Sequence, residues 1–140
     1  MNWSIKEQVP TFAVPDLELG VQFYSRLGFE VEWRWPKTGT TCVGLRHGLC
    51  ALMLSLCEPA ERGDIYYVVD DVRACYEHLQ TTRPWGIAEV FCGSRKRKDC
   101  PLARSLVSPV APSLRDHGHV DFSIADTWGH QSTFGREVID

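Results

Sequence analysis

The amino-acid sequence predicts an α+β fold built from two similar modules, each with a strand, a helix and then further short strands. The first observation is residues 12–31, which read as strand, turn, helix, glycine stop and strand. The second is the return of the strand-and-helix pattern at 67–79, where Asp71 stands 55 residues after Asp16. Short strand-like runs follow each helix, which favours two modules over a doubly wound parallel sheet.

Both predicted helices have a start signal and an apolar stripe. The carboxylate of Asp16 can accept from the free amides of the first turn and suits the positive end of the helix dipole. Apolar residues then recur at helical spacing, at Leu17, Val21, Tyr24 and Leu27. Gly28 can adopt the left-handed conformation that ends a helix. In the second module Asp71 takes the capping position, and the stripe is Val72, Tyr76 and Leu79.

The strands are predicted from alternating or apolar runs between turn signals. In module one they lie at 9–14, 29–35, 41–46 and 50–56, the last two forming a hairpin around His47 and Gly48. Strict alternation predicts one shared face for Phe29, Val31, Trp33 and Trp35. In module two the predicted strands lie at 64–69, 87–92, 118–124 and 130–135, and the polar residues 58–63 are the predicted linker between the modules.

A basic, proline-containing insert, residues 93–116, interrupts module two and has no usable periodicity. Its six Lys and Arg residues outnumber its two Asp residues, so its net charge is +4 and that of the rest of the chain is −7. A long segment of this kind is usually either solvated and mobile or a lid over a pocket. A contact with an anion or a nucleic acid through the run 95–98 is the third interpretation.

Length and composition limit the classes of protein to consider. At 140 residues, 44% hydrophobic and 24% charged, the chain predicts one folded domain, 1–140, with module one at about 1–58 and module two at about 63–140. A net charge of −3 argues against a nucleic-acid partner. Neither a membrane-spanning run nor a signal-peptide layout is present, so we expect a cytoplasmic protein with no membrane partner. The six cysteines include no C-x-x-C pair and predict buried free thiols.

Four short motifs in a fixed order carry a resemblance to a known family. They are VPDL at 14–17, FYSRLGF at 23–29, VDDV at 69–72 and DTWG at 126–129. The sequence resembles the vicinal oxygen chelate superfamily, which contains glyoxalase I, extradiol dioxygenases and bleomycin resistance proteins. The resemblance implies two βαβββ modules that form a curved mixed β-sheet cup with helices on the outer face, completed as a homodimer. Function does not follow from the fold, because the superfamily contains both enzymes and plain binders.

The resemblance also implies where a catalytic metal would be held. The family's ligand positions fall on Val9, Met53, Asp64 and Thr133, which supply only one carboxylate. Catalytic metal sites need about three protein ligands, so we expect no metal and no cofactor. An unrecognised site around His117, His119, Asp121 and His130 remains an alternative, either for a metal or for acid-base chemistry. The simpler interpretation is that these four residues are hydrogen-bonded polar side chains on a partly solvent-exposed sheet.

When the cavity positions of the family are mapped onto this sequence, they fall on aromatic and polar side chains. The predicted ligand-binding residues are Trp33, Trp35, Met53, Tyr66, His119, Asp121 and Thr133. Such a surface suits metal-independent binding of a small organic, aromatic ligand, with resistance by sequestration as in bleomycin resistance proteins. The alternatives are a lyase, isomerase or dioxygenase with a non-standard His-based site, and a structural module in which Trp33 and Trp35 are core or dimer-interface residues.

Overall fold

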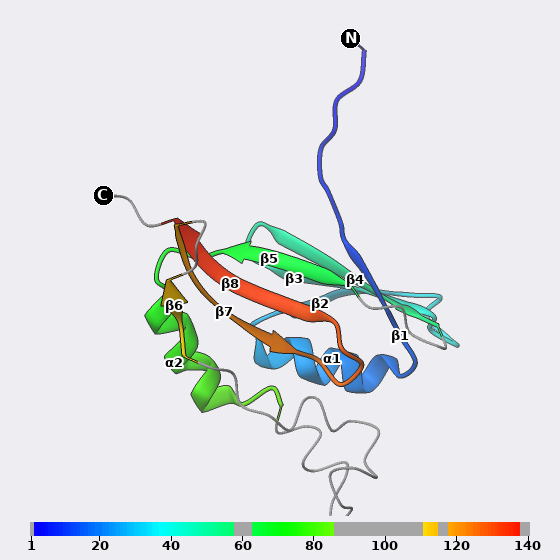
Figure 1. Ribbon diagram of the computed structural model, residues 1–140. Coiled ribbons are helices and arrows are strands. Elements are labelled where there is room, and N and C mark those ends of the chain that lie inside the picture. The colour runs from blue at the N-terminus through cyan, green and yellow to red at the C-terminus, as the bar shows by residue number, and fades with distance from the viewer. Residues whose placement is uncertain (1, 58–62, 86–110, 115–117, 138–140) are drawn as a thin grey trace, which may run out of the picture. The chain divides into compact units, whose positions relative to one another are not determined.

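A computed structural model describes residues 2–57, 63–85, 111–114 and 118–137 of the chain (Figure 1). The chain divides into two compact units, Met1–Glu61 (unit 1) and Arg62–Asp140 (unit 2). No helix in these described ranges is both long enough and apolar enough to cross a membrane.

Unit 1 is a four-stranded mixed sheet with one helix. Its elements are β1 (Thr11–Val14), α1 (Leu17–Arg26), β2 (Glu30–Trp35), β3 (Cys42–His47) and β4 (Cys50–Leu56). The strand order is β1-β4-β3-β2, with β1 parallel to β4 and the other pairs antiparallel. Helix α1 packs against β2, β3 and β4, so it covers one face of this sheet.

Unit 2 repeats this topology with its own helix and sheet. Its elements are β5 (Asp64–Val68), α2 (Val72–Thr82), β6 (Ser113–Leu114), β7 (His119–Ala125) and β8 (Gln131–Glu137). The order is β5-β8-β7-β6, β5 is parallel to β8, and α2 packs against β7 and β8. The predicted α+β fold with two βαβββ modules is therefore confirmed.

Both helices begin as the sequence predicts. The carboxylate of Asp16 accepts from Leu19 N at 3.1 Å, and that of Asp71 accepts from Ala74 N at 2.9 Å. Gly28, with φ +97°, follows α1 in the left-handed conformation. The second helix runs past the last residue of its predicted stripe, Leu79, and ends at Thr82.

Each unit buries the apolar stripe of its helix against its sheet. In unit 1, Phe23 and Tyr24 are among the most buried side chains, and their rings meet edge to face at 5.0 Å between centroids. In unit 2, the rings of Phe122 and Phe134 stack at 5.4 Å on the face that α2 covers. The strand residues that alternate with these core residues lie on the opposite face of each sheet. We call these the open face of unit 1 and the open face of unit 2.

Strand β2 departs from the predicted alternation. A register shift between Val31 and Trp33 places Val31 opposite Leu45 but Trp33 opposite Gly44. Leu45 is buried toward α1, whereas Gly44 lies on the open face, so the bulge turns Trp33 and Trp35 away from Phe29 and Val31. The prediction of one shared face for these four residues is wrong, because one extra residue in a strand reverses every side chain that follows.

Part of the basic insert also differs from its sequence pattern. Periodicity did not indicate a strand within 93–116, yet Ser113–Leu114 pairs with β7 as strand β6. Residues 93–110, the predicted strand 87–92 and most of the linker 58–63 lie outside the described residues.

The described cysteines form no disulfide, as predicted, but none of them is buried, so the prediction of buried thiols is wrong for these four. Cys42 and Cys75 are half-buried, whereas Cys50 and Cys57 are exposed. Burial raises the pKa of the Cys75 thiol to about 11. Cys92 and Cys100 lie outside the described residues.

Candidate functional site on the open faces

The open face of unit 1 carries three of the predicted ligand-binding residues. Trp33 on β2 lies opposite Gly44 on β3, and Gly44 lies opposite Met53 on β4. Met53 in turn pairs with Thr11 on β1, so one row crosses the whole sheet. Trp35 follows two residues along β2 on the same face, opposite Cys42. Trp33 is 42% exposed and Trp35 is 65% exposed, so both indoles present apolar surface to solvent.

A glycine beneath the first indole fixes its position. A Cβ on Gly44 would overlap Cε2 and Nε1 of Trp33, so the indole occupies the space that any other residue would need for its side chain. A glycine inside a strand often marks such a close approach by an aromatic ring. The ring thus rests against the sheet backbone and keeps surface available for a ligand.

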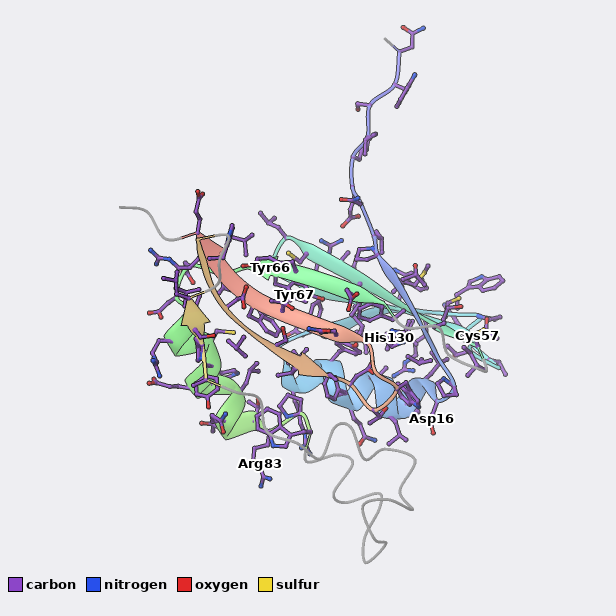
Figure 2. All side chains as sticks on the ribbon, in the orientation of Figure 1. Asp16, Cys57, Tyr66, Tyr67, Arg83 and His130 are labelled. Atoms are coloured by element: carbon purple, nitrogen blue, oxygen red, sulfur yellow. The ribbon has the colours of Figure 1, made fainter. Side chains whose placement is uncertain are left out.

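The open face of unit 2 carries the other four predicted residues. Tyr66 on β5 lies opposite Thr133 on β8, and Thr133 lies opposite Ser123 on β7. The hydroxyl oxygens of Thr133 and Ser123 are 2.7 Å apart and share a hydrogen bond. Figure 2 shows Tyr66 and its neighbour Tyr67 on β5; Tyr67 packs instead against the core residue Phe134 at 5.2 Å.

Tyr66, Asp121 and His119 form a compact polar group on this face. A Cβ on Gly135 would overlap the Tyr66 hydroxyl and lie 2.6 Å from Cβ of Asp121, so Gly135 leaves the space that these two side chains share. The imidazole of His119 meets the Tyr66 ring edge to face, with 6.0 Å between centroids. Asp121 is only 4% exposed. The group therefore combines a phenol, a buried carboxylate and an imidazole within one unit.

The environment of Tyr66 favours its protonated form. Desolvation and, second, the negative charge of Asp121 raise the pKa of the phenol above its ordinary value. Both effects act in the same direction because each disfavours a phenolate. At neutral pH the Tyr66 hydroxyl is consequently a hydrogen-bond donor for a ligand acceptor.

We expect this shift to appear in a spectroscopic titration. Alkaline titration followed by phenolate absorbance should include a step above the ordinary value of about 10 that is lost in Tyr66→Phe. Asp121→Asn removes the charge and should move the step back toward the ordinary value. Since the folded-state pKa is raised, the stability that Tyr66 contributes is present below the ordinary pKa and is lost as pH rises through the raised pKa. An unchanged step in Asp121→Asn would contradict the assignment.

His130, a member of the alternative His-based site, lies at the other end of the hairpin. His119 pairs with Glu137, whereas His130 directly precedes Gln131, which pairs with Ala125. Its side chain, labelled in Figure 2, is 1% exposed. Its Nδ1 accepts from Gly63 N at 2.9 Å. The predicted grouping of His119 with His130 is therefore wrong: the strand length separates them, and His130 holds the turn against the start of β5.

The donor set at the family's metal positions does not fit a divalent cation. Val9 has no side-chain donor atom, Met53 offers a soft thioether, and the Thr133 hydroxyl is already bonded to Ser123, so Asp64 is left as the single carboxylate. Among the residues that the structure describes, no group of three or more His, Cys, Asp and Glu side chains is arranged to hold a metal. His117, which the sequence placed in the alternative site, lies outside that part of the chain.

Sequence reasoning did not single out three residues that shape these faces, Gly44, Ser123 and Gly135. Each glycine interrupts a run that otherwise reads as a strand, and an isolated glycine in a strand is itself a signal of close backbone approach. That signal does not tell which ring lies on the glycine, because the ring comes from a neighbouring strand. Register was needed to pair Gly44 with Trp33.

Comparison with solved structures gives the same fold in other proteins. A bleomycin resistance determinant encoded on the transposon Tn5 matches with a TM-score of 0.66 and 17% identity over 96% of this chain and 100% of that one. A bleomycin-binding protein in complex with bleomycin matches with a TM-score of 0.66 and 20% identity over 96% and 100%. A glyoxalase/bleomycin resistance protein from Catenulispora acidiphila DSM 44928 matches with a TM-score of 0.62 and 18% identity over 94% and 97%. These identities show a shared fold alone.

Sequence comparison identifies the family. A search of curated proteins by sequence gives no match. The sequence model of the Glyoxalase/Bleomycin resistance protein/Dioxygenase superfamily matches residues 8–131, which is most of the chain. The match includes both capped helices and every strand of unit 1, and it ends at the first residue of β8. The chain therefore belongs to the Glyoxalase/Bleomycin resistance protein/Dioxygenase superfamily.

Proposed function

We propose that this protein binds a small, flat organic molecule without the help of a metal. The observation that carries the proposal is Trp33, whose indole rests on Gly44 and is 42% exposed. Trp35 and the thioether of Met53 extend this surface on the same face. Aromatic ligands stack on such rings, and a soft methionine adapts to their outline.

The open face of unit 2 supports the proposal with groups that would orient a ligand. The Tyr66 hydroxyl donates, the Asp121 carboxylate accepts, and His119 and Thr133 add further polar atoms. A few well-placed polar groups in mostly apolar surroundings are typical of small-molecule sites. Asp121 also favours a ligand group that donates hydrogen bonds or carries positive charge.

Sequestration of a toxic compound is the biological role that we infer from this binding. A protein of the same fold is described as a bleomycin-binding protein in complex with bleomycin, which makes bleomycin the first ligand to test here. The donor set at Val9, Met53 and Thr133 supports binding rather than metal chemistry. We also propose that the protein acts in the cytoplasm as a homodimer. The exposed indoles of unit 1 support the homodimer, and the thiols of Cys42, Cys50 and Cys75, which form no disulfide, support the cytoplasm.

Calorimetry tests the proposed function directly. Bleomycin, followed by a panel of flat aromatic compounds, should bind the metal-stripped chain in a fixed stoichiometry, with the same affinity in the presence and absence of EDTA. Light scattering on the same sample should give a dimer. Affinity that disappears in EDTA and returns with a divalent metal would overturn the metal-independent mechanism, and an absence of binding to every compound would overturn the proposed function.

A further inference from the structure

Unit 1 contains a pocket that none of the predicted ligand-binding residues lines. Its volume is about 420 Å³, and it opens where β2 begins and the β3–β4 hairpin turns. The lining residues come from both places: Gly28 before β2 with Glu30, Val31 and Glu32 at its start, and Arg46 and His47 at the end of β3 with Gly48 in the turn. The volume lies within the range of small-molecule sites.

The one guanidinium in the lining is already held by two carboxylates. Arg46 Nε donates to Glu32 at 2.5 Å, and Arg46 Nη2 donates to Glu7 at 2.6 Å. These hydrogen bonds, the one to Glu32 first, raise the pKa of Arg46. An anionic ligand would have to compete with both carboxylates for this guanidinium.

A third carboxylate, Glu30, leaves the pocket with an excess of negative charge. Glu30 lies opposite Arg46 in the β2–β3 register. Across the described residues of the chain, the Glu30 carboxylate makes no ion pair, and Arg46 pairs with Glu32 and Glu7. The lining therefore carries two carboxylates, Glu30 and Glu32, and one guanidinium that Glu7 also holds, so the local charge favours a cation.

The walls of the pocket add apolar surface and a fixed shape. Val31, which also lines the pocket, is 40% exposed. The His47 ring lies against Gly28, where a Cβ would be 3.0 Å from Cε1, and it meets the buried ring of Phe29 edge to face at 5.5 Å. The imidazole is thus supported by the core of unit 1. At Gly48 a Cβ would meet nothing within 4 Å, so this side of the pocket is open.

We propose that this pocket binds a small organic cation, a primary ammonium group on a short hydrocarbon chain. The ammonium donates to Glu30 and Glu32, and the hydrocarbon lies along Val31. A compact ammonium with three donors suits several exposed carboxylates at once. The binding is weakened by salt, because the carboxylates are exposed and their attraction is screened. This inference does not depend on the proposed function, since the two sites share no residue.

Titration of the full chain with 1,4-diaminobutane, followed by amide NMR at low ionic strength, tests the inference. We expect saturable shifts at Gly28, Val31 and Gly48, and much smaller shifts with 1,4-butanediol or succinate, the neutral and anionic compounds of matching length. Glu30→Gln should lower the affinity for the diamine about threefold to fivefold, as expected for losing one exposed ion pair. Glu77→Gln, an exposed carboxylate on α2, is the matched control and should leave the affinity unchanged.

Three results would overturn the inference. They are equal shifts with the diamine and the diol, an affinity in Glu30→Gln equal to that in Glu77→Gln, and saturable shifts confined to residues outside the pocket. Glu32→Gln serves as a second variant, because Arg46 keeps its bond to Glu7 there. It should also weaken the binding of the diamine relative to Glu77→Gln.

Discussion

Replacing Trp33 with alanine is expected to weaken the binding of bleomycin at least tenfold, measured by calorimetry on the metal-stripped chain. The indole is exposed on one side and rests on Gly44 on the other, so the ligand gains a large apolar contact without having to order a mobile side chain. A tenfold loss corresponds to about 1.4 kcal/mol, a modest value for a central aromatic residue in a binding site. Trp33→Phe should retain part of the affinity because a flat ring remains.

Trp3→Ala provides the matched control for this prediction. Trp3 is 66% exposed and belongs to the segment before β1, so its removal changes tryptophan content without touching the open face. The affinity of the Trp3→Ala variant for bleomycin should equal that of the unchanged chain. If Trp33→Ala binds as tightly as Trp3→Ala, the indole of Trp33 is not part of the site.

Replacing His130 with alanine is expected to lower the free energy of unfolding by about 2–4 kcal/mol, measured by urea denaturation. The imidazole is 1% exposed, so its removal leaves a cavity. The substitution also leaves Gly63 N without its acceptor, and a partly buried donor without a partner is costly. The effect should be seen in unit 2, where Gly63 N and His130 connect the start of β5 to the β7–β8 turn.

His119→Ala is the natural comparison, because His119 is half-buried and makes a ring contact with Tyr66 on the open face. This substitution should lower the free energy of unfolding by less than about 1 kcal/mol, in line with the loss of a single aromatic contact. Equal losses of stability in the two variants would contradict the structural role of His130. A stoichiometric metal that His130→Ala removes without unfolding the chain would return His130 to the alternative His-based site.

Local signals allowed the helices and most strands of the fold to be predicted from the sequence. Asp16 and Asp71 mark both helix starts because a side-chain cap is decided within four residues of chain. The bulge in β2 could not be read in the same way. Its position depends on how β2 pairs with β3, and the alternation of 29–35 looks regular without that partner.

The candidate site was predicted in part, for the same reason. The family register placed Met53, Tyr66 and Thr133 on one face of their strands, and the structure has them on the open faces. Trp33 was predicted as a ligand contact but with the wrong neighbours, since Val31 was expected beside it. Gly135, which lets Tyr66 approach Asp121, cannot be recognised from local sequence because the three residues come from three strands.

The position of the bound ligand tests the central claim most directly. NMR of the isotopically labelled chain with bleomycin should shift the indole Nε1–H signal of Trp33 and the methyl signal of Met53, in the presence of EDTA as in its absence. The Trp3 indole should not shift, because it lies in the segment before β1. Shifts that spare Trp33 and Met53, or that require a divalent metal, would contradict metal-independent binding on the open face of unit 1.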